Sequence, residues 1–362
     1  MRILVLNWRD LKHPRAGGSE VYSQHLARFW ATQGHDVTFF CAASPGLAAR
    51  EEVDGYQVVR RGNRFMVYRE ARAFYRESGV GRYDAVLDVI NARPFLTPRW
   101  RGDSALVALV HHVEGEVWHY EVPLPAALLG RYILEPRWLR AYRDCRVLTV
   151  SESSRKELIE LGLRNVTVVH EGVDQPIDRP LPPKAAVPTW LFVGRLTPNK
   201  RPDHAILAHR RLRELLPEAN LWVVGDGPME AELRKLAGPG VEFFGRVDAG
   251  VKQDLMASAH AVIGTGVREG WGLTISEAAR LGTRAIAYDV VGLRDSVPPA
   301  GGVLVEPSPG ALAAAAARLL PQWMAEGRAD LGDAGVLDWD QVAEEVLEHI
   351  QAEVEVNAQV RV

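Results

Sequence analysis

The chain has 362 residues, more than one ordinary α/β domain needs, and this length suits two domains of about 150–180 residues each. Hydrophobic residues make up 47% and charged residues 25%, and the net charge is −3, so the composition is globular and argues against non-specific binding to nucleic acids. No run approaches the roughly 18 apolar residues of a membrane span, and the opening MRILVL is too short for a signal peptide. Cys41 and Cys145 have no second Cys or His at metal-binding spacing, which predicts reduced, buried thiols in a cytoplasmic protein.

Short apolar runs alternate with amphipathic helical patterns from the first residues onward, which is typical of a parallel α/β sheet. A strand is predicted at 2–6, followed by a helix in which Tyr22, Leu26 and Trp30 repeat at helical spacing and which ends at Gly34. Further strands are predicted at 37–41, 56–60, 85–90, 105–110, 147–150 and 166–169. Residues 1–174 are therefore predicted to form one Rossmann-like domain.

A proline-rich stretch separates this series from a second one. The residues DQPIDRPLPPKAAVP, at 174–188, cannot sustain a helix and predict a linker over 175–188. Strands are then predicted at 190–193, 221–224, 241–244, 261–264, 284–288 and 303–305, which gives a second Rossmann-like domain over 189–335. A helical pattern at about 340–354 predicts a helix within 336–362 that packs on the outside. The expected fold is α/β, with two Rossmann-like domains facing across a cleft.

The strongest motif is EGWGLTISE at 269–277, between a predicted strand and a predicted helix. Gly270 and Gly272 let the backbone approach a ligand closely, and the start of the helix offers free N–H groups to a phosphate. Glu269 and Glu277 then bracket that phosphate, an arrangement that suits the sugar and ribose hydroxyls of a sugar nucleotide. The alternatives are a capping box formed by Thr274 and Glu277, and a solvated loop carboxylate at position 269.

A second motif, GRLTPNKR at 194–201, directly follows a predicted strand. Ligands of open α/β sheets lie at the carboxyl ends of strands, so a phosphate is expected here. Arg195 can bind it through two donors, and Lys200 can neutralise it as a point charge. A solvated basic loop is the alternative, although it leaves the stiffening prolines Pro198 and Pro202 unexplained.

Two glycines, Gly17 and Gly18, stand between the first strand and the first helix. They permit a tight crossing and open the helix start to an anion. The sequence there is not GxGxxG, so a dinucleotide site is disfavoured. Ser19 as an ordinary N-cap is compatible with either interpretation.

Two adjacent histidines, His111 and His112, follow the strand predicted at 105–110. Neighbouring side chains on a strand point to opposite faces, so at most one is expected to enter a cleft. A structural role is the alternative. His119 lies nearby in the sequence, but the spacing matches no compact zinc site, and no metal is expected.

Two further loops follow strands of the second series. Gly225-Asp-Gly227-Pro228 and Gly245-Arg246-Val247 are expected at the same sheet edge as the motifs above. Backbone groups of Arg246 and Val247 are candidates for holding a nucleobase, and tight turns are an equally good interpretation of both loops.

The chain carries a series of motifs in a fixed order: AGGSE, the histidine after a strand, VGRLTPNKRPD, VVGDGP, FFGRV and EGWGLTISE. This series resembles that of the retaining family 4 glycosyltransferases of the GT-B fold. The resemblance extends over nearly the whole chain. It implies that Glu269 binds sugar hydroxyls, that Glu277 binds the ribose, and that Arg195 and Lys200 stabilise the leaving diphosphate. The remaining residues that it assigns to the site are His111, or His112 with a one-residue shift, together with the backbone groups of Gly17, Gly18, Gly270, Trp271, Gly272, Leu273 and Thr274.

The activity implied is retaining transfer of a hexose-type sugar from a UDP- or GDP-sugar, without a metal or other cofactor. The acceptor is a sugar, a lipid-linked molecule or a natural product, and the resemblance is to bacterial members. Aromatic and basic residues in the predicted loops 9–15, 63–72, 91–102 and 114–125 leave peripheral membrane association open. The alternatives are a catalytically silent sugar-nucleotide-binding partner of another transferase and a nucleotide-sugar epimerase of the same fold.

Overall fold

The computed structural model describes residues 1–79, 81–331 and 337–359. Contacts divide the chain into two compact units, each containing its own sheet. Unit 1 comprises Met1–Gly115, Leu124–Gly172 and Leu337–Val362, and unit 2 comprises Glu116–Pro123 and Val173–Val336. The domain boundary predicted at 335/336 lies outside the described residues. Within them, no helix combines the length and apolar character needed to span a bilayer.

Unit 1 is built on an eight-stranded sheet in the order β3-β4-β2-β1-β5-β6-β7-β8. Every pair of neighbours is parallel except β3 and β4. The strands are β1 (Arg2–Leu6), β2 (Asp36–Cys41), β3 (Arg50–Val53), β4 (Tyr56–Arg60), β5 (Ala85–Ile90), β6 (Ala105–Val110), β7 (Arg146–Thr149) and β8 (Asn165–Val168). The apolar runs predicted as strands are therefore present, and the α/β fold class is confirmed.

Sequence analysis missed β3, whose residues REEV are charged rather than apolar. An edge strand tolerates such residues because one side of it faces solvent. β3 pairs antiparallel with β4 across the turn Asp54-Gly55, where both residues have positive φ, 47° and 85°. An Asp-Gly pair is the sequence signal of this kind of hairpin.

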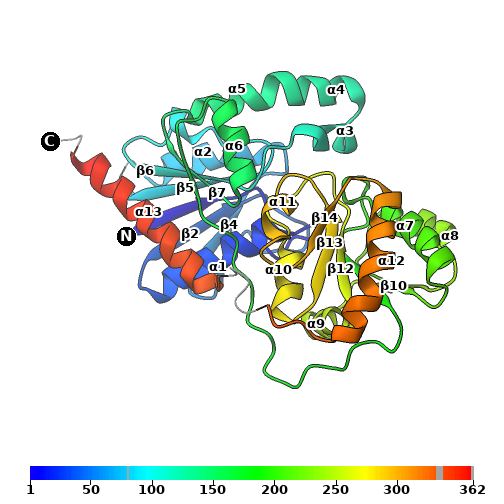
Figure 1. Cartoon of the computed structure of the whole chain (residues 1–362). Helices are drawn as coiled ribbons and strands as arrows, with labels where there is room; N and C mark the ends of the chain where they lie inside the picture. Colours follow the sequence, from blue (N-terminus) through cyan, green and yellow to red (C-terminus); the bar gives the residue numbers. More distant parts are fainter. Residues whose placement is uncertain (80, 332–336, 360–362) are drawn as a thin grey trace. The chain divides into compact units, whose positions relative to one another are not determined.

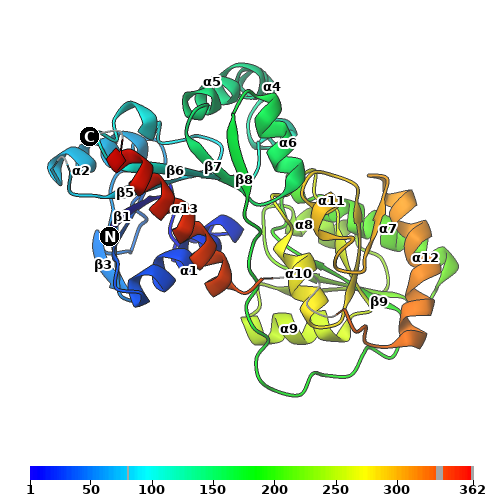
Figure 2. The ribbon, with the colours of Figure 1, turned by 60° about the vertical axis from the view of Figure 1, so that its left-hand side comes forward.

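Helices α1 (Gly18–Thr32), α2 (Val67–Glu77), α6 (Glu152–Glu160) and α13 (Trp339–Gln359) pack against the strands of this sheet. The unit also contains α4 (Leu124–Leu129) and α5 (Glu135–Leu139). The last helix of the chain, α13, lies alongside α1 (Figures 1 and 2). The indole N–H of the fully buried Trp30 donates to the carbonyl of Ala343 at 2.8 Å. Residues near the C-terminus therefore complete the core of the unit that the N-terminus begins.

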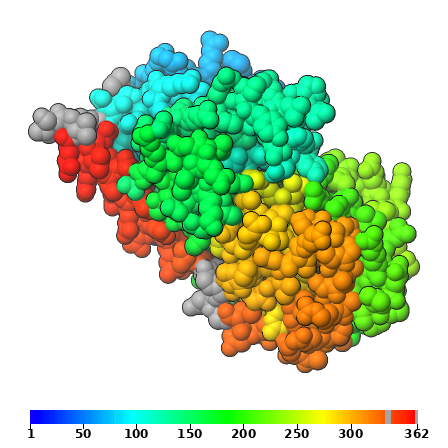
Figure 3. Space-filling model, turned by 45° about the horizontal axis from the view of Figure 1, so that its top comes forward, coloured from blue at the N-terminus to red at the C-terminus, as the bar shows by residue number. Residues whose placement is uncertain are grey.

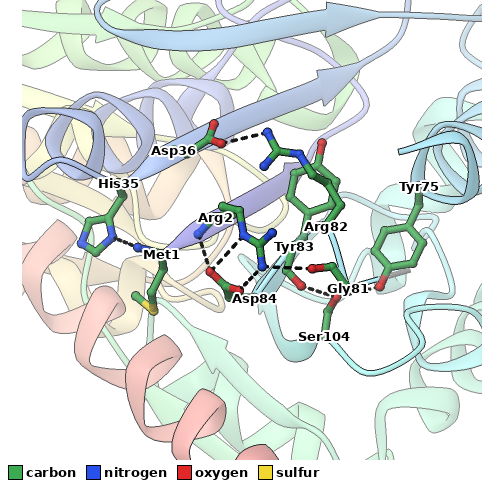
Figure 4. A network of polar contacts seen from close by, with 10 residues as sticks. All are labelled: Met1, Arg2, His35, Asp36, Tyr75, Gly81, Arg82, Tyr83, Asp84 and Ser104. Carbon is green, nitrogen blue, oxygen red and sulfur yellow. Dashed lines mark hydrogen bonds and ion pairs between the residues drawn. The ribbon is translucent and has the colours of Figure 1, made fainter. Parts of the chain in front are cut away.

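A polar network closes the amino-terminal edge of this sheet (Figure 4). Arg2 binds Asp84 through its backbone N–H and its guanidinium, both at 2.7 Å, and Arg82 pairs with Asp36 at 2.9 Å. The hydrogen bond from the Arg2 side chain holds the pKa of Asp84 below its usual value. This edge is occupied by structural contacts, and the carboxyl-terminal edge is the one with open loops.

One carboxylate lies in the core of unit 1. Asp88, in β5, is fully buried, and it accepts hydrogen bonds from the hydroxyls of Tyr142 and Thr97. Burial raises the pKa of Asp88 to about 6, although the two hydroxyl donors oppose that shift.

Unit 2 is built on a six-stranded, entirely parallel sheet in the order β11-β10-β9-β12-β13-β14. Its strands are β9 (Thr189–Val193), β10 (Asn220–Val224), β11 (Val241–Gly245), β12 (Ala261–Gly264), β13 (Arg284–Tyr288) and β14 (Val303–Val305). Its helices are α3 (Trp118–Glu121), α7 (Pro202–Leu215), α8 (Glu230–Leu236), α9 (Ala249–Ser258), α10 (Leu273–Arg280), α11 (Leu293–Ser296) and α12 (Pro309–Glu326). Apolar clusters fill both faces of the sheet, which explains why its strands read as continuous apolar runs.

The strand order of unit 2 reverses at β9. From β9 the chain runs outward to β10 and β11, then returns to the other side of β9 with β12, β13 and β14. Loops diverge at such a reversal and leave a crevice at the carboxyl ends of the two central strands. In unit 2 these are the loops that follow β9 and β12.

Candidate active site

The loops after β9 and β12 are hydrogen-bonded to each other at this reversal point. The hydroxyl of Thr265 donates to the carbonyls of Lys200 at 2.8 Å and Arg201 at 3.0 Å. The amide of Val267 donates to the carbonyl of Asn199 at 2.9 Å. The basic loop and the carboxylate-containing loop, far apart in the sequence, are therefore held together by hydrogen bonds to the backbone carbonyls of the basic loop.

Lys200 and Glu269 form an ion pair across these loops. The Lys200 Nζ lies 2.6 Å from Oε1 and 2.5 Å from Oε2 of Glu269, and the two side chains are 25% and 21% exposed. Both groups are close enough to solvent to exchange one partner for another. The structure thus brings together two residues that the sequence assigned to one site.

Arg195 lies in the same loop, between β9 and the short helical turn η5 (Pro198–Lys200). Its side chain is half-buried and forms no hydrogen bond or ion pair with any of the residues that the structure describes. A guanidinium without a partner among the described residues suits an anionic ligand.

Glycines after β10 fix the path of the Arg195 loop. A Cβ on Gly225, whose φ is +129°, would lie 1.9 Å from the carbonyl oxygen of Gly194. A Cβ on Gly227 would lie 2.5 Å from that of Leu196. The Gly225–Gly227 loop is therefore a tight turn that supports the neighbouring loop by close backbone approach.

The helix α10 begins directly after the turn 270–272, and the backbone amides of its first turn have no capping side chain. Its N-cap is Gly272, with φ +103° and no side chain to cap the helix. The capping-box interpretation is wrong, because Thr274 lies inside the helix and the Glu277 carboxylate accepts a hydrogen bond from Lys252 Nζ at 2.8 Å. Among the described residues, no acceptor meets the backbone N–H groups of Gly270, Gly272, Leu273 and Thr274. This helix start is ready to receive an anion.

Trp271 anchors the turn that carries these amides. Its side chain is buried, and its indole N–H donates to Ser276 Oγ at 2.8 Å. Its carbonyl accepts from Ser296 Oγ at 2.7 Å. A Cβ on Gly292 would lie 2.3 Å from the carbonyl oxygen of Glu269, so the neighbouring loop also fixes Glu269 by close contact.

The candidates for holding a nucleobase lie farther along the sheet. Arg246 and Val247 follow β11, which is two strands from β9. Arg246 is exposed, and Val247 packs against one of the two apolar clusters of unit 2. In the part of the chain that the structure describes, neither residue forms a hydrogen bond or ion pair with Lys200 or Glu269.

In unit 1, the glycine pair starts α1 after β1. The N-cap is Gly17, whose N–H is bound at 2.7 Å by the carboxylate of Glu20. The interpretation of Ser19 as the N-cap is wrong, since Ser19 lies in the first turn and donates to Glu20 at 3.1 Å. The N–H of Gly18 has no acceptor among the described residues and remains directed out of the helix start.

The two histidines after β6 have different environments. His111 is buried, its Nδ1 lies 3.1 Å from Oε1 of the buried Glu171, and its ring meets that of Tyr22 edge to face at 5.2 Å. The Nε2 of His111 and the hydroxyl of Tyr22 are both buried, and neither has a hydrogen-bond partner among the described residues. His112 is 28% exposed, with its Nε2 3.9 Å from Glu114.

Three residues that contact the site were not predicted from the sequence: Lys252, Glu171 and Gly292. Lys252 lies in α9 and Glu171 follows β8, each far in sequence from its partner. Glu171 had one usable signal, since it is a carboxylate just beyond the carboxyl end of a strand.

Two Rossmann-like units with open loops at the carboxyl ends of their strands define the GT-B class of glycosyltransferases. Solved structures of this class match nearly the whole chain: sucrose-phosphate synthase from Thermosynechococcus elongatus has a TM-score of 0.78 at 19% identity, covering 97% of this chain and 98% of that one. Anabaena HepE in complex with UDP-glucose has a TM-score of 0.73 at 16% identity, covering 97% and 100%.

Matches of the sequence to family models identify the family. The model of glycosyltransferase family 4 matches residues 16–175, and that of the group 1 glycosyl transferases matches residues 174–336. The chain belongs to the family 4 glycosyltransferases. Among its relatives is the glycogen synthase of Mycobacterium tuberculosis strain H37Rv, 28% identical over 82% of this chain and 80% of that enzyme.

Proposed function

We propose that this glycosyltransferase moves a hexose-type sugar from a UDP- or GDP-sugar with retention of anomeric configuration and without a metal ion. The observation that carries the proposal is the Lys200–Glu269 pair, which lies at the strand reversal of unit 2 and is joined to the open start of α10 by the turn 270–272. Cation, carboxylate and helix start together match a diphosphate with a sugar at one end.

The chemical demand of the transfer is the departure of a charged diphosphate. The free amides at the start of α10 are fixed by the helix before the donor arrives, so they stabilise that charge without reorganising. Arg195 adds a cation, and Lys200 adds a second one when it exchanges Glu269 for the phosphate. Glu269 then binds sugar hydroxyls, and Glu277, already paired with Lys252, binds the ribose. A leaving group stabilised in this way needs no general acid and no metal.

The base of the donor and the acceptor are proposed from separate observations. Anabaena HepE, of the same fold, has a solved structure in complex with UDP-glucose, which supports UDP. GDP is supported by a GDP-mannose-dependent mannosyltransferase of Mycobacterium tuberculosis, 29% identical over 46% of this chain. We assign the acceptor to unit 1, where His111 and Gly18 lie. The two thiols, which form no disulfide, accord with a cytoplasmic location.

The test begins with the wild-type protein and free nucleotides. A nucleoside diphosphate that binds the folded state raises the melting temperature, so UDP, GDP and dTDP are compared by thermal shift. The matching sugar nucleotides are then incubated with mixed acceptors in the presence of EDTA, and the product anomer is assigned by NMR.

Three outcomes would overturn the proposal. Conversion of the donor to an isomer without acceptor would indicate an epimerase. Nucleotide binding with no transfer to any acceptor would indicate a silent partner. Equal turnover by wild type and by Lys200→Met would refute the proposed donor site. Lys235→Met, at an exposed position, is the matched control.

A further inference from the structure

An apolar stripe faces outward on one helical run of unit 1. The run consists of α4, the π-helical turn η3 (Gly130–Leu134) and α5, which follow one another without a break over residues 124–139 (Figure 1). Of the sixteen exposed large hydrophobic side chains among the described residues, five lie within residues 124–133. They are Leu124 at 62% exposure, Leu128 at 44%, Leu129 at 46%, Tyr132 at 62% and Ile133 at 40%.

The opposite face of the run is anchored in the unit. Ala127 and Leu139 are buried in it, and so is the carboxylate of Glu135. Glu135 accepts hydrogen bonds from the backbone amides of Glu114 at 2.6 Å and Gly115 at 3.2 Å. A buried carboxylate with two backbone donors fixes the rotation of the helix, so the apolar stripe is held outward.

This arrangement reverses the usual pattern of a surface helix. The outward face of such a helix is normally polar, and its apolar face meets the core. Here the inner face is occupied and the outer face is apolar as well. In the space-filling view the atoms of this segment, coloured teal, lie at the surface of unit 1 (Figure 3). A second apolar face calls for a second apolar environment.

Charge identifies that environment. Beyond the stripe, Arg137, Arg140 and Arg143 are exposed, and Arg131 is partly exposed beside Tyr132. Glu135 is the only acidic residue between 124 and 143, and it is buried. The exposed charges within this segment are therefore all basic, although the whole chain has a net charge of −3. Asp144, directly beyond the segment, is paired with Arg164 at 3.2 Å.

We propose that residues 124–143, the docking helix, bind the surface of an anionic lipid bilayer. Leucine, isoleucine and tyrosine side chains enter the boundary between headgroups and acyl chains, and the arginines meet lipid phosphates. The inference stands apart from the proposed sugar transfer, because binding to vesicles is measured without donor or acceptor.

The experiment is vesicle co-sedimentation of the full chain. Vesicles of phosphatidylcholine with about 30% phosphatidylglycerol are compared with phosphatidylcholine alone, at low and high salt. We expect binding to the anionic vesicles that falls with salt. Leu128→Glu with Tyr132→Glu, and separately Arg137→Glu with Arg140→Glu, are each expected to lower the partition coefficient at least tenfold.

A matched control carries Leu215→Glu with Arg318→Glu, both exposed in unit 2, and is expected to bind like wild type. Melting temperatures verify that each variant folds. The proposal fails if wild type ignores anionic vesicles or if the control loses binding equally. It also fails if wild type is a dimer without lipid that Leu128→Glu with Tyr132→Glu turns into a monomer, since the stripe would then be an interface between copies.

Discussion

Replacing Glu269 with glutamine is expected to tighten the binding of a free nucleoside diphosphate while it impairs sugar transfer. Both carboxylate oxygens of Glu269 bind Lys200 Nζ in the structure, at 2.6 and 2.5 Å. A diphosphate that engages Lys200 must therefore replace an existing partner. Glutamine keeps the size of the side chain and removes its charge, which releases Lys200 for the phosphate.

The magnitude follows from the exposure of the pair, 25% and 21%. The strength of the Lys200–Glu269 pair should lie between that of a surface ion pair, about 0.2–1 kcal/mol, and that of a buried one, whose disruption costs about 3–5 kcal/mol. A competition of about 1 kcal/mol corresponds to roughly fivefold tighter binding of UDP or GDP. Transfer by the same variant is expected to fall on the order of a hundredfold, because the sugar loses its charged partner.

Lys200→Met is expected to have the opposite effect on binding. It removes a charged hydrogen bond of about 1.5–3 kcal/mol, so the nucleotide binds roughly 10- to 150-fold more weakly. The carboxylate of Glu269, left without its cation, adds repulsion.

Isothermal titration calorimetry with the nucleotide that stabilises wild type measures both changes. Glu232→Gln and Lys235→Met, both exposed in α8, are the matched controls and should bind like wild type. Binding by Glu269→Gln that equals or falls below wild type would refute the competition, and an unaltered affinity of Lys200→Met would refute the site itself.

Three further predictions test the supports of the two units. Gly225→Ala should lower stability by on the order of 3 kcal/mol, because its Cβ meets a carbonyl at 1.9 Å, whereas Gly34→Ala, with open space, should cost only about 1 kcal/mol; urea unfolding measures both. Because the pKa of Asp88 is raised in the folded state, its protonated carboxyl group stabilises the fold fully below about pH 4, and this stabilisation is lost as pH rises through about 6. The free energy of unfolding should then fall by up to about 3 kcal/mol. Unfolding measured at pH 4.5 and 7 should show this loss in wild type and much less of it in Asp88→Asn. Glu171→Gln should slow transfer about tenfold or more by loosening His111, yet leave nucleotide affinity as in wild type; a parallel loss of affinity would contradict a role confined to unit 1.

The sheets were predictable because burial on both faces leaves a direct trace in the sequence. Runs such as Ala105–Val110 are apolar throughout, since helices cover the sheet on each side. β3 (Arg50–Val53) left no such trace, because an edge strand needs no apolar residues. The turn Asp54-Gly55 was the available signal, and recognising it would have supplied the missing strand.

Helix starts and side-chain partners were harder to predict. Ser19 and Thr274 are common N-cap residues at plausible spacing, but glycines took the capping positions at both helices, leaving open amides where a side chain would have covered them. The partners Lys252 and Glu171 depend on which segments the topology brings together, and composition near either residue carries no record of that.

The position of α13 (Trp339–Gln359) has a consequence for biosynthesis. Unit 2 interrupts unit 1 in the sequence, and the final helix returns to α1, where the Trp30 indole finds its acceptor on Ala343. On the ribosome, the inserted unit is complete and free to fold before the segment that finishes the first-synthesised unit has emerged. Unit 1 begins to emerge before unit 2, yet it is completed only when α13 emerges, so its α1 surface stays uncovered until then.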